Sequence, residues 1–457
     1  LRHSFEYDDA REAFLEAQKL DPKMAMAYWG EAMTYNHSLW NEQDYDDGKT
    51  ALDKLNEFDY KDTTSELEQD FIEAAKILYK PETEKKARDK EYSQFMSGLN
   101  QKYPNNHEVA AFYALSLLGA SEDGRDYELY GQGAKIAQGI IEENPNHPGA
   151  LHYLIHSYDD PEHAHLALSA ADAYAKVAPD ASHALHMPSH IYVAKGMWDQ
   201  VVSSNINSYQ ASLNRMERKN LDNDDRGYHA YHWLQYGYLQ KGNVDEAKDM
   251  ALEMEKFMKE KPSKRARAHM VFLKGTYLNE TNDWDSEVAD IDVKISDLNI
   301  SIRSQYHFLE GMKAFKTEDI QKMDSIIELM EQDYNRESYI VENEGTQLCS
   351  AITREQATKS DLIEAKVRQA QLLGLKSDLE GRTEEAESFF KEAISLNESI
   401  SYSFGPPHIQ KPTHDLYADW LLSQGRTEEA RIYYEESLKY APKRTLALKG
   451  LEKTTQF

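Results

Sequence analysis

The sequence predicts an all-α protein made of stacked pairs of antiparallel helices. Three observations lead to this fold class. Glycine and proline are sparse, at 21 and 13 residues in 457, so the chain lacks the turn residues of a β-sandwich. A short pattern of small and large residues recurs at both ends and in the middle. A chain of 457 residues is long for one core but ordinary for units that pack only on their neighbours.

The first unit lies at the amino end, in AREAFLEAQKLDP, residues 10–22. Two stretches near the carboxyl end, GRTEEAESFFKEAISLN and GRTEEARIYYEESLKYAP, repeat its order of small and large residues. The residues that carry the pattern are Ala10, Phe14, Ala17 and Pro22; Gly381, Ala386, Phe390 and Ala393; and Gly425, Ala430, Tyr434 and Pro442. In this pattern the chain resembles the tetratricopeptide-repeat (TPR) family, whose 34-residue unit is a pair of amphipathic helices.

The resemblance implies a right-handed superhelical solenoid, with a concave face on which such proteins usually bind. In the middle of the chain, Tyr158, Tyr192 and Tyr238 take one equivalent position of three units, which sets the register without using any histidine. We expect one continuous solenoid, with N-terminal units at 1–60, degenerate repeats at 61–145, His-rich units at 146–255, degenerate repeats at 256–360, and C-terminal units with a capping helix at 361–457.

Histidines gather on one face of three successive first helices of these units. The chain has 17 histidines, and many lie between residues 152 and 232. In the register set by the packing residues they are spaced i, i+3 and i+7, which makes one stripe turned away from the packing stripe. By resemblance to the family, this stripe lines the concave groove. The residues expected there are His152, His156, His183, His186, His190, His229, His232 and Tyr236.

The spacing predicts a site for a divalent transition metal. His152 with His156, and His186 with His190, lie one helical turn apart and could each chelate an ion. Neighbouring helices pack about 8 to 10 Å apart, a gap that imidazoles can bridge through a metal. The expected ligands are His152, His156, His183, His186, His190 and Asp159, as four imidazoles or as three imidazoles with Asp159 and an open position. Such ligands suit zinc, copper or iron, and the single cysteine, Cys349, excludes a thiolate cluster.

Two classes of function stay open. A metal site with an open position can activate water or oxygen, which would make the protein a metal-dependent hydrolase or oxidase. The alternative is a non-catalytic scaffold whose polar groove binds a peptide, a partner protein or a small molecule. In both cases the ligand groove would include His229, His232, His3 and Tyr236. No phosphate loop, HExxH or GxSxG motif occurs, and the catalytic residues stay unknown.

Two prolines mark expected helix boundaries near these histidines. Pro188 lies inside a predicted first helix, where it removes a backbone hydrogen bond, so we expect a kink between His186 and His190. Asp160 followed by Pro161 has the pattern of an N-cap and first-turn proline, and predicts the start of a second helix there.

Four longer blocks resemble a bacterial subgroup of long TPR proteins. They are FEYDDAREAF, HPGALHYLIHSYDDPEHA, HALHMPSHIYVAKGMWDQVVSSN and FGPPHIQKPTHDLYADWLL. The subgroup has no firmly established reaction. The resemblance adds His3, on the groove side of its unit, and His414, at a position where packing is the commoner role. Members are often exported, which favours a periplasmic or exported location and leaves a cytoplasmic one open; a leader removed before Leu1 is compatible with the sequence.

The net charge of the chain limits the kinds of partner that it can bind. The net charge is −28 and the pI is about 5.0, a field that repels phosphate backbones, so we expect no nucleic-acid partner. The same field attracts cations and basic peptides. No stretch approaches the roughly 18 apolar residues of a membrane span, so none is expected.

Overall fold

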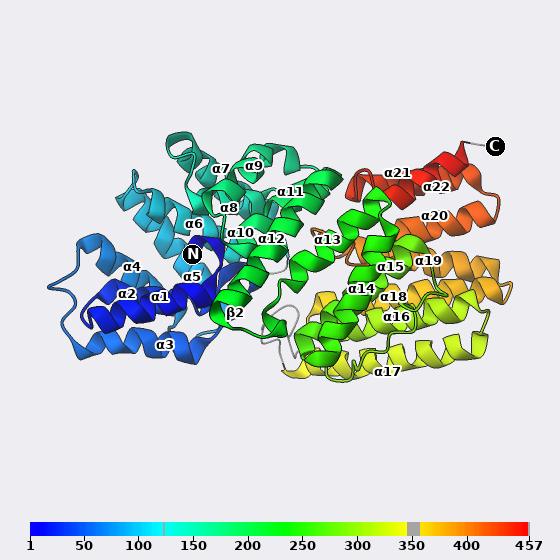
Figure 1. The fold of residues 1–457 in the computed structure, drawn as a ribbon, viewed down its shortest axis with the longest axis horizontal. Helices are drawn as coiled ribbons and strands as arrows, with labels where there is room; N and C mark the ends of the chain where they lie inside the picture. Colours follow the sequence, from blue (N-terminus) through cyan, green and yellow to red (C-terminus); the bar gives the residue numbers. More distant parts are fainter. Residues whose placement is uncertain (122–123, 345–356, 456–457) are drawn as a thin grey trace. The chain divides into compact units, whose positions relative to one another are not determined.

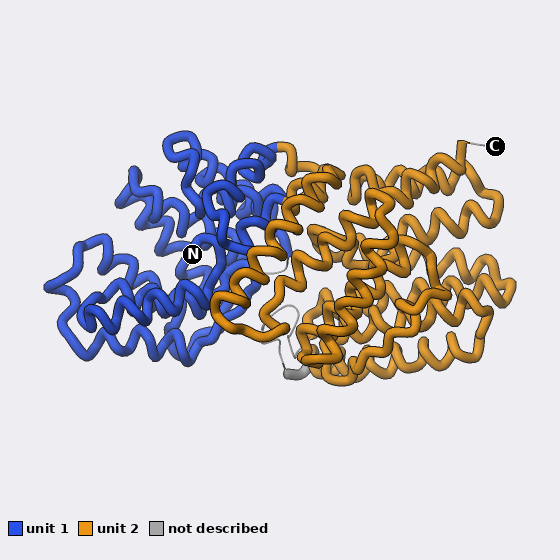
Figure 2. Tube along the Cα trace, in the orientation of Figure 1, with its two compact units in different colours: residues 1–159, 166–188 blue, residues 160–165, 189–457 orange. Residues whose placement is uncertain are grey.

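The computed structural model describes residues 1–121, 124–344 and 357–455, and Cys349 lies outside the described residues. Helices dominate it, and the predicted all-α fold is confirmed (Figure 1). The described residues contain only two short strands, β1 (Asn36–His37) and β2 (Glu42–Gln43), which pair antiparallel. The chain divides into two compact units, residues 1–159 with 166–188 and residues 160–165 with 189–457 (Figure 2). None of the described helices is long and apolar enough to cross a membrane.

Unit 1 is a series of helices in which successive members pack on one another. Its core contains buried residues of α2 to α6, among them Tyr28, Phe71, Met96 and Phe112. Besides the strands, its elements are η1 (Arg2–Ser4), α1 (Tyr7–Leu20), α2 (Ala25–Met33), η2 (Ser38–Trp40), α3 (Tyr45–Asp53), η3 (Lys54–Glu57), α4 (Glu66–Leu78), α5 (Lys85–Lys102), α6 (His107–Gly119), α7 (Tyr127–Glu143), α8 (Pro148–Ser157), α9 (Leu168–Val177) and α10 (Ser182–His186).

Unit 2 has its own core, which runs from Val202 to Tyr434. The small and large residues of the repeat pattern meet there as the pattern requires: a Cβ placed on Gly374 of α18 would lie 2.7 Å from the Phe390 ring of α19. The elements are α12 (Trp198–Lys219), η5 (Asn223–Asp225), α13 (Tyr228–Lys241), α14 (Val244–Glu260), α15 (Lys264–Thr281), α16 (Ile300–Lys316), α17 (Ile320–Glu344), α18 (Lys359–Leu379), α19 (Thr383–Glu398), α20 (Thr413–Ser423), α21 (Thr427–Tyr440) and the expected capping helix α22 (Thr445–Thr454).

Two elements, η4 (Ala164–Leu166) and α11 (Pro188–Ala194), run across the bounds of the units. Pro188 interrupts its helix as predicted, because α10 ends at His186 and α11 begins at Pro188. The prediction that a helix starts at Asp160 is wrong. The Asp160 carboxylate accepts from the backbone N–H groups of Glu162 and His163, but it caps a turn, and α9 begins only at Leu168.

Candidate metal centre

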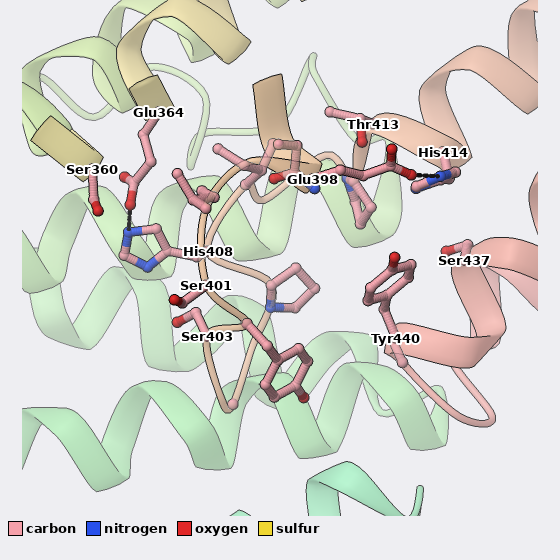
Figure 3. A pocket seen from close by; sticks show the side chains of 18 residues that line it. Ser360, Glu364, Glu398, Ser401, Ser403, His408, Thr413, His414, Ser437 and Tyr440 are labelled. Atoms are coloured by element: carbon pink, nitrogen blue, oxygen red, sulfur yellow. Dashed lines mark ion pairs between the residues drawn. The ribbon is translucent and has the colours of Figure 1, made fainter. Parts of the chain in front are cut away.

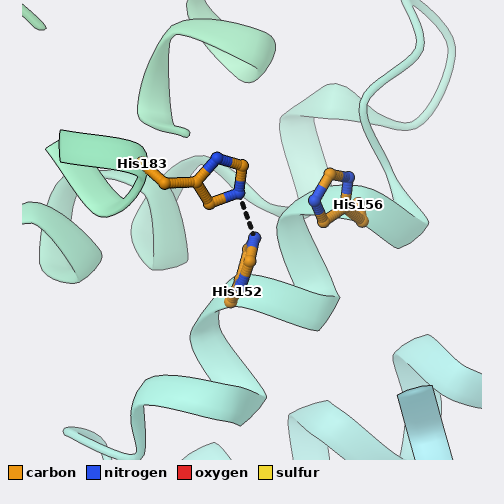
Figure 4. Close-up of side chains that lie close together, drawn as sticks. All are labelled: His152, His156 and His183. Carbon is orange, nitrogen blue, oxygen red and sulfur yellow. Dashed lines mark hydrogen bonds between the residues drawn. The ribbon is translucent and has the colours of Figure 1, made fainter. Parts of the chain in front are cut away.

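Three histidines of unit 1 converge from two helices. His152 and His156 lie one turn apart on α8, and His183 lies on α10 (Figure 4). The start of α8 is defined locally, since Pro148 is its first residue and the His147 side chain accepts a hydrogen bond from the Ala150 N–H at 3.2 Å. One ring nitrogen of each of the three lies within 4.8 Å of the others, so the groups could hold one ion.

The hydrogen bond of His152 Nδ1 sets the tautomer of this ring. Its Nδ1–H donates to the backbone carbonyl of His3 at 2.6 Å, which leaves the lone pair on Nε2. That Nε2 faces Nε2 of His183 at 3.1 Å (Figure 4). Two ligands held at the usual zinc–nitrogen distance in a tetrahedral site are about 3.4 Å apart. A proton on His183 or a shared ion can therefore occupy the same short gap.

Asp159 lies beside this cluster and is fully buried. Its Oδ2 is 3.6 Å from Nδ1 of His156, and its other oxygen makes an ion pair with Arg125. Arg125 also donates to the backbone carbonyl of Ser157 at 3.1 Å, at the end of α8. The carboxylate thus neutralises a buried guanidinium and faces the ring of His156.

Aromatic rings enclose the three histidines. The Phe5 ring centre lies 4.4 Å from that of His152, 5.5 Å from that of His183 and 6.1 Å from that of His156, and Tyr174 stacks on His152 at 5.1 Å. Phe5 is buried and has a left-handed backbone, with φ of 54°, which is unusual for a bulky residue. Sequence reasoning missed Phe5; the FEYDD block contained it, but no spacing rule marks an aromatic ring beside a metal site.

His3 contributes its backbone to the cluster, while its ring is engaged elsewhere. Nε2–H donates to the Glu108 carboxylate at 2.8 Å, and Nδ1 accepts from the Tyr153 hydroxyl at 2.7 Å. Burial lowers the pKa of His3, so the ring is neutral near pH 7. Hydrogen bonds from His147 and His3 lower the pKa of Glu108 well below its usual range.

The other expected ligands occupy different surroundings. His186 is buried in unit 1, with its ring centre 6.5 Å from that of His183. His190 belongs to unit 2, where it is buried against Trp233 at 4.7 Å and Phe404 at 4.6 Å. The two histidines therefore belong to different units.

The remaining groove residues lie on α13 of unit 2, and His414 lies on α20. His229 is exposed and 5.5 Å from the Trp233 ring, while His232 binds the Thr276 hydroxyl at 2.8 Å and burial lowers its pKa to about 3. Tyr236 is buried, and burial raises its pKa. His414 is buried and stacks on Tyr440 at 5.7 Å, which agrees with the packing role expected for its position.

Comparisons with known proteins identify the repeat. A family model of the tetratricopeptide repeat matches residues 414–444. No curated protein matches the chain. Among solved structures, a monomeric mutant of IFIT1 with m7Gppp-AAAA has a TM-score of 0.42 and 13% identity, covering 98% of this chain and 86% of that chain. Yeast Tom70 has a TM-score of 0.34 and 14% identity, covering 98% and 85%. Likenesses this distant carry no argument about activity.

Proposed function

We propose that this all-α chain, which carries a tetratricopeptide repeat at residues 414–444, binds a divalent transition metal through His152, His156 and His183 of unit 1. The observation that carries the proposal is the pair of Nε2 atoms of His152 and His183, 3.1 Å apart, with the opposite nitrogen of His152 bound to a carbonyl. Metal-binding histidines are usually oriented in this way by a carbonyl or carboxylate on their second nitrogen.

Imidazole ligands favour zinc, copper or iron, and a three-histidine set leaves one position open in a tetrahedral site. The sequence predicted Asp159 as a further metal ligand beside the imidazoles. Its contacts with Arg125 and His156 support a positioning role instead, in which it orients the His156 ring. His186 and His190 stay predicted ligands. When bound, the ion would supply an activated water or oxygen at the open position, the chemistry of a hydrolase or an oxidase.

Metal analysis of protein purified without a histidine tag tests this proposal. We expect about one equivalent of zinc, copper or iron per chain, and a thermal shift on adding zinc to stripped protein. His183→Ala should weaken zinc binding at least tenfold, because one of three ligands is lost. His183 lies on a short helix and is only partly buried, so the variant should fold.

His165→Ala is the matched control, since His165 is exposed and its Nδ1 contacts the Glu162 carbonyl at 3.0 Å. It should bind zinc as the wild type does. Wild-type protein that takes up none of these metals, and shows no thermal shift with zinc, copper, iron or nickel, would refute the proposal.

A second candidate function is peptide binding on the same face of unit 1. The observation that favours it is the segment Leu1–Glu6, which already places a peptide backbone against α8: the His3 carbonyl accepts from His152, and the Glu6 carboxylate accepts from the His183 N–H at 3.0 Å. A fluorescent basic peptide, chosen for the net charge of −28, should bind in the presence of a chelator if this function holds. Absence of binding by the stripped protein would exclude it.

A further inference from the structure

The segment between α19 and α20 of unit 2 builds a cavity that the repeat pattern does not explain. Residues 399–412 run without regular structure between the two helices, and they contain the GPPHIQKP part of the fourth sequence block. The cavity has a volume of about 230 Å³. Its lining includes side chains of α18, α19, α20 and α21 besides the segment itself (Figure 3).

One side of the cavity carries cationic and hydroxyl-bearing side chains that can donate hydrogen bonds. His408 Nε2 lies 2.6 Å from the Glu364 carboxylate, and Glu364 also contacts the buried guanidinium of Arg368 at 3.4 Å. The charge of Glu364 raises the pKa of His408, with a smaller contribution from the buried Asp361, so a protonated His408 and Arg368 face two carboxylates. The hydroxyl-bearing Ser401 and Ser403 lie on the same side as His408 (Figure 3). Together they offer hydrogen-bond donors to an anion.

The other side carries a carboxylate and a buried hydroxyl. Glu398 lies 3.4 Å from Nε2 of His414, and burial lowers the pKa of His414, so at neutral pH the ring beside this carboxylate is neutral. Tyr440 stacks on His414 and presents its ring to the cavity (Figure 3). Thr413 is 2% exposed, and its Oγ1 has no hydrogen-bond partner among the described residues.

A buried hydroxyl without a hydrogen-bond partner is destabilising, so a ligand atom that binds the Thr413 hydroxyl from the cavity would offset that loss. A carboxylate, a hydroxyl oxygen and an aromatic face on one side suit an ammonium group. The imidazolium and hydroxyls on the opposite side suit a carboxylate. Such separated charges do not match a free α-amino acid, whose two groups share one carbon. Each added residue separates the termini by about 3.5 Å.

We propose that this cavity binds a dipeptide or tripeptide by both of its termini. The peptide carboxylate lies at His408, Ser401 and Ser403. The ammonium group lies at Glu398, Thr413 and Tyr440. The binding requires no metal, and it does not depend on the histidine cluster of unit 1.

Calorimetric titration of the full chain with Ala-Ala and Ala-Ala-Ala tests the proposal. We expect saturable binding of at least one of them. N-acetyl-Ala-Ala lacks the ammonium group and Ala-Ala-amide lacks the carboxylate, and each should bind at least tenfold more weakly than Ala-Ala. Free alanine should bind more weakly still, since it cannot reach both sides.

Glu398→Gln should weaken Ala-Ala binding at least tenfold, and acetylation should then cause little further loss. His408→Gln should likewise weaken Ala-Ala binding at least tenfold, and amidation of the peptide should then cause little further loss. Glu398 is about half exposed, so its variant should fold, and Thr413→Val gives a second, nearly isosteric probe. Glu392→Gln, an exposed position on α19 outside the cavity, is the control. Absence of binding at millimolar peptide, equal binding of the blocked peptides, or an unaffected Glu398→Gln variant would overturn the proposal.

Discussion

At the scale of single residues, burial decides the protonation of several histidines. His269 on α15 is 1% exposed, and its Nδ1–H donates to the Arg265 carbonyl at 2.8 Å. Burial lowers its pKa from 6.5 to about 3, with a further contribution from the charge of Arg265. Burial also lowers the pKa of His232, on α13, to about 3. Both rings therefore stay neutral in the folded protein where the unfolded chain would protonate them.

This difference predicts a pH-dependent stability. Between pH 6.5 and about 3 the unfolded chain binds a proton that folded His269 does not, so the free energy of unfolding falls as pH falls. The loss should reach about 1.4 kcal/mol per pH unit for one such histidine. Urea unfolding at pH 7.5, 6.0 and 5.0 should show a shallower pH dependence for His269→Leu than for wild type. His165→Ala should keep the wild-type dependence, and an unchanged slope in His269→Leu would contradict the argument.

The candidate site could be predicted from sequence only where a helical spacing marks it. The packing register placed His152, His156 and His183 on one face, and they do lie together in unit 1. The register could not find Phe5 or Arg125, because these reach the cluster through tertiary contacts that no spacing encodes. The register also could not show that His3 acts through its backbone. The His3 ring binds Glu108, whereas the His3 carbonyl orients His152.

At the scale of helices, the apolar pattern predicted pairing well and helix starts less well. Gly374 meets Phe390 because the pattern pairs a small residue of one helix with a large residue of the next. Pro188 ends a helix because its ring allows no backbone hydrogen bond there. Asp160 failed as a helix start because the same carboxylate geometry also caps an isolated turn.

Two glycines of α7 give opposite predictions within one helix. A Cβ on Gly133 would lie 2.5 Å from Leu118 Cδ1 and 3.2 Å from the Ala114 carbonyl oxygen of α6, whereas a Cβ on Gly139 would meet nothing within 4 Å. Gly133→Ala should lower the free energy of unfolding by about 1 to 3 kcal/mol through overpacking. Gly139→Ala should raise it by up to about 1 kcal/mol, because alanine favours the helix. Denaturant titration of both variants checks the sign, and a shift in the same direction for both would reject this account.

At the scale of the whole molecule, the sequence predicted the fold class, and the expected arrangement as one continuous array stays a prediction beside the two compact units of the structure. Repeat units at both ends and in the middle led to one continuous array as the expectation. The bounds of the units fall where the chain leaves regular repeats, around the irregular stretch after α8 and the helix break at Pro188. Composition could not reveal this, because the residues on both sides follow the same repeat pattern.

Each proposed ligand should therefore stabilise its own unit. A ligand that binds only the folded state protects the elements that close around it, and repeat units contact mainly their neighbours. In hydrogen exchange followed by mass spectrometry, zinc should slow exchange in α8 and α10 and leave residues 399–423 unchanged. Ala-Ala should do the reverse. His183→Ala should lose only the first protection and Glu398→Gln only the second. If either ligand protected both regions alike, the two sites would be energetically coupled, and the stabilisation by each ligand would not be local.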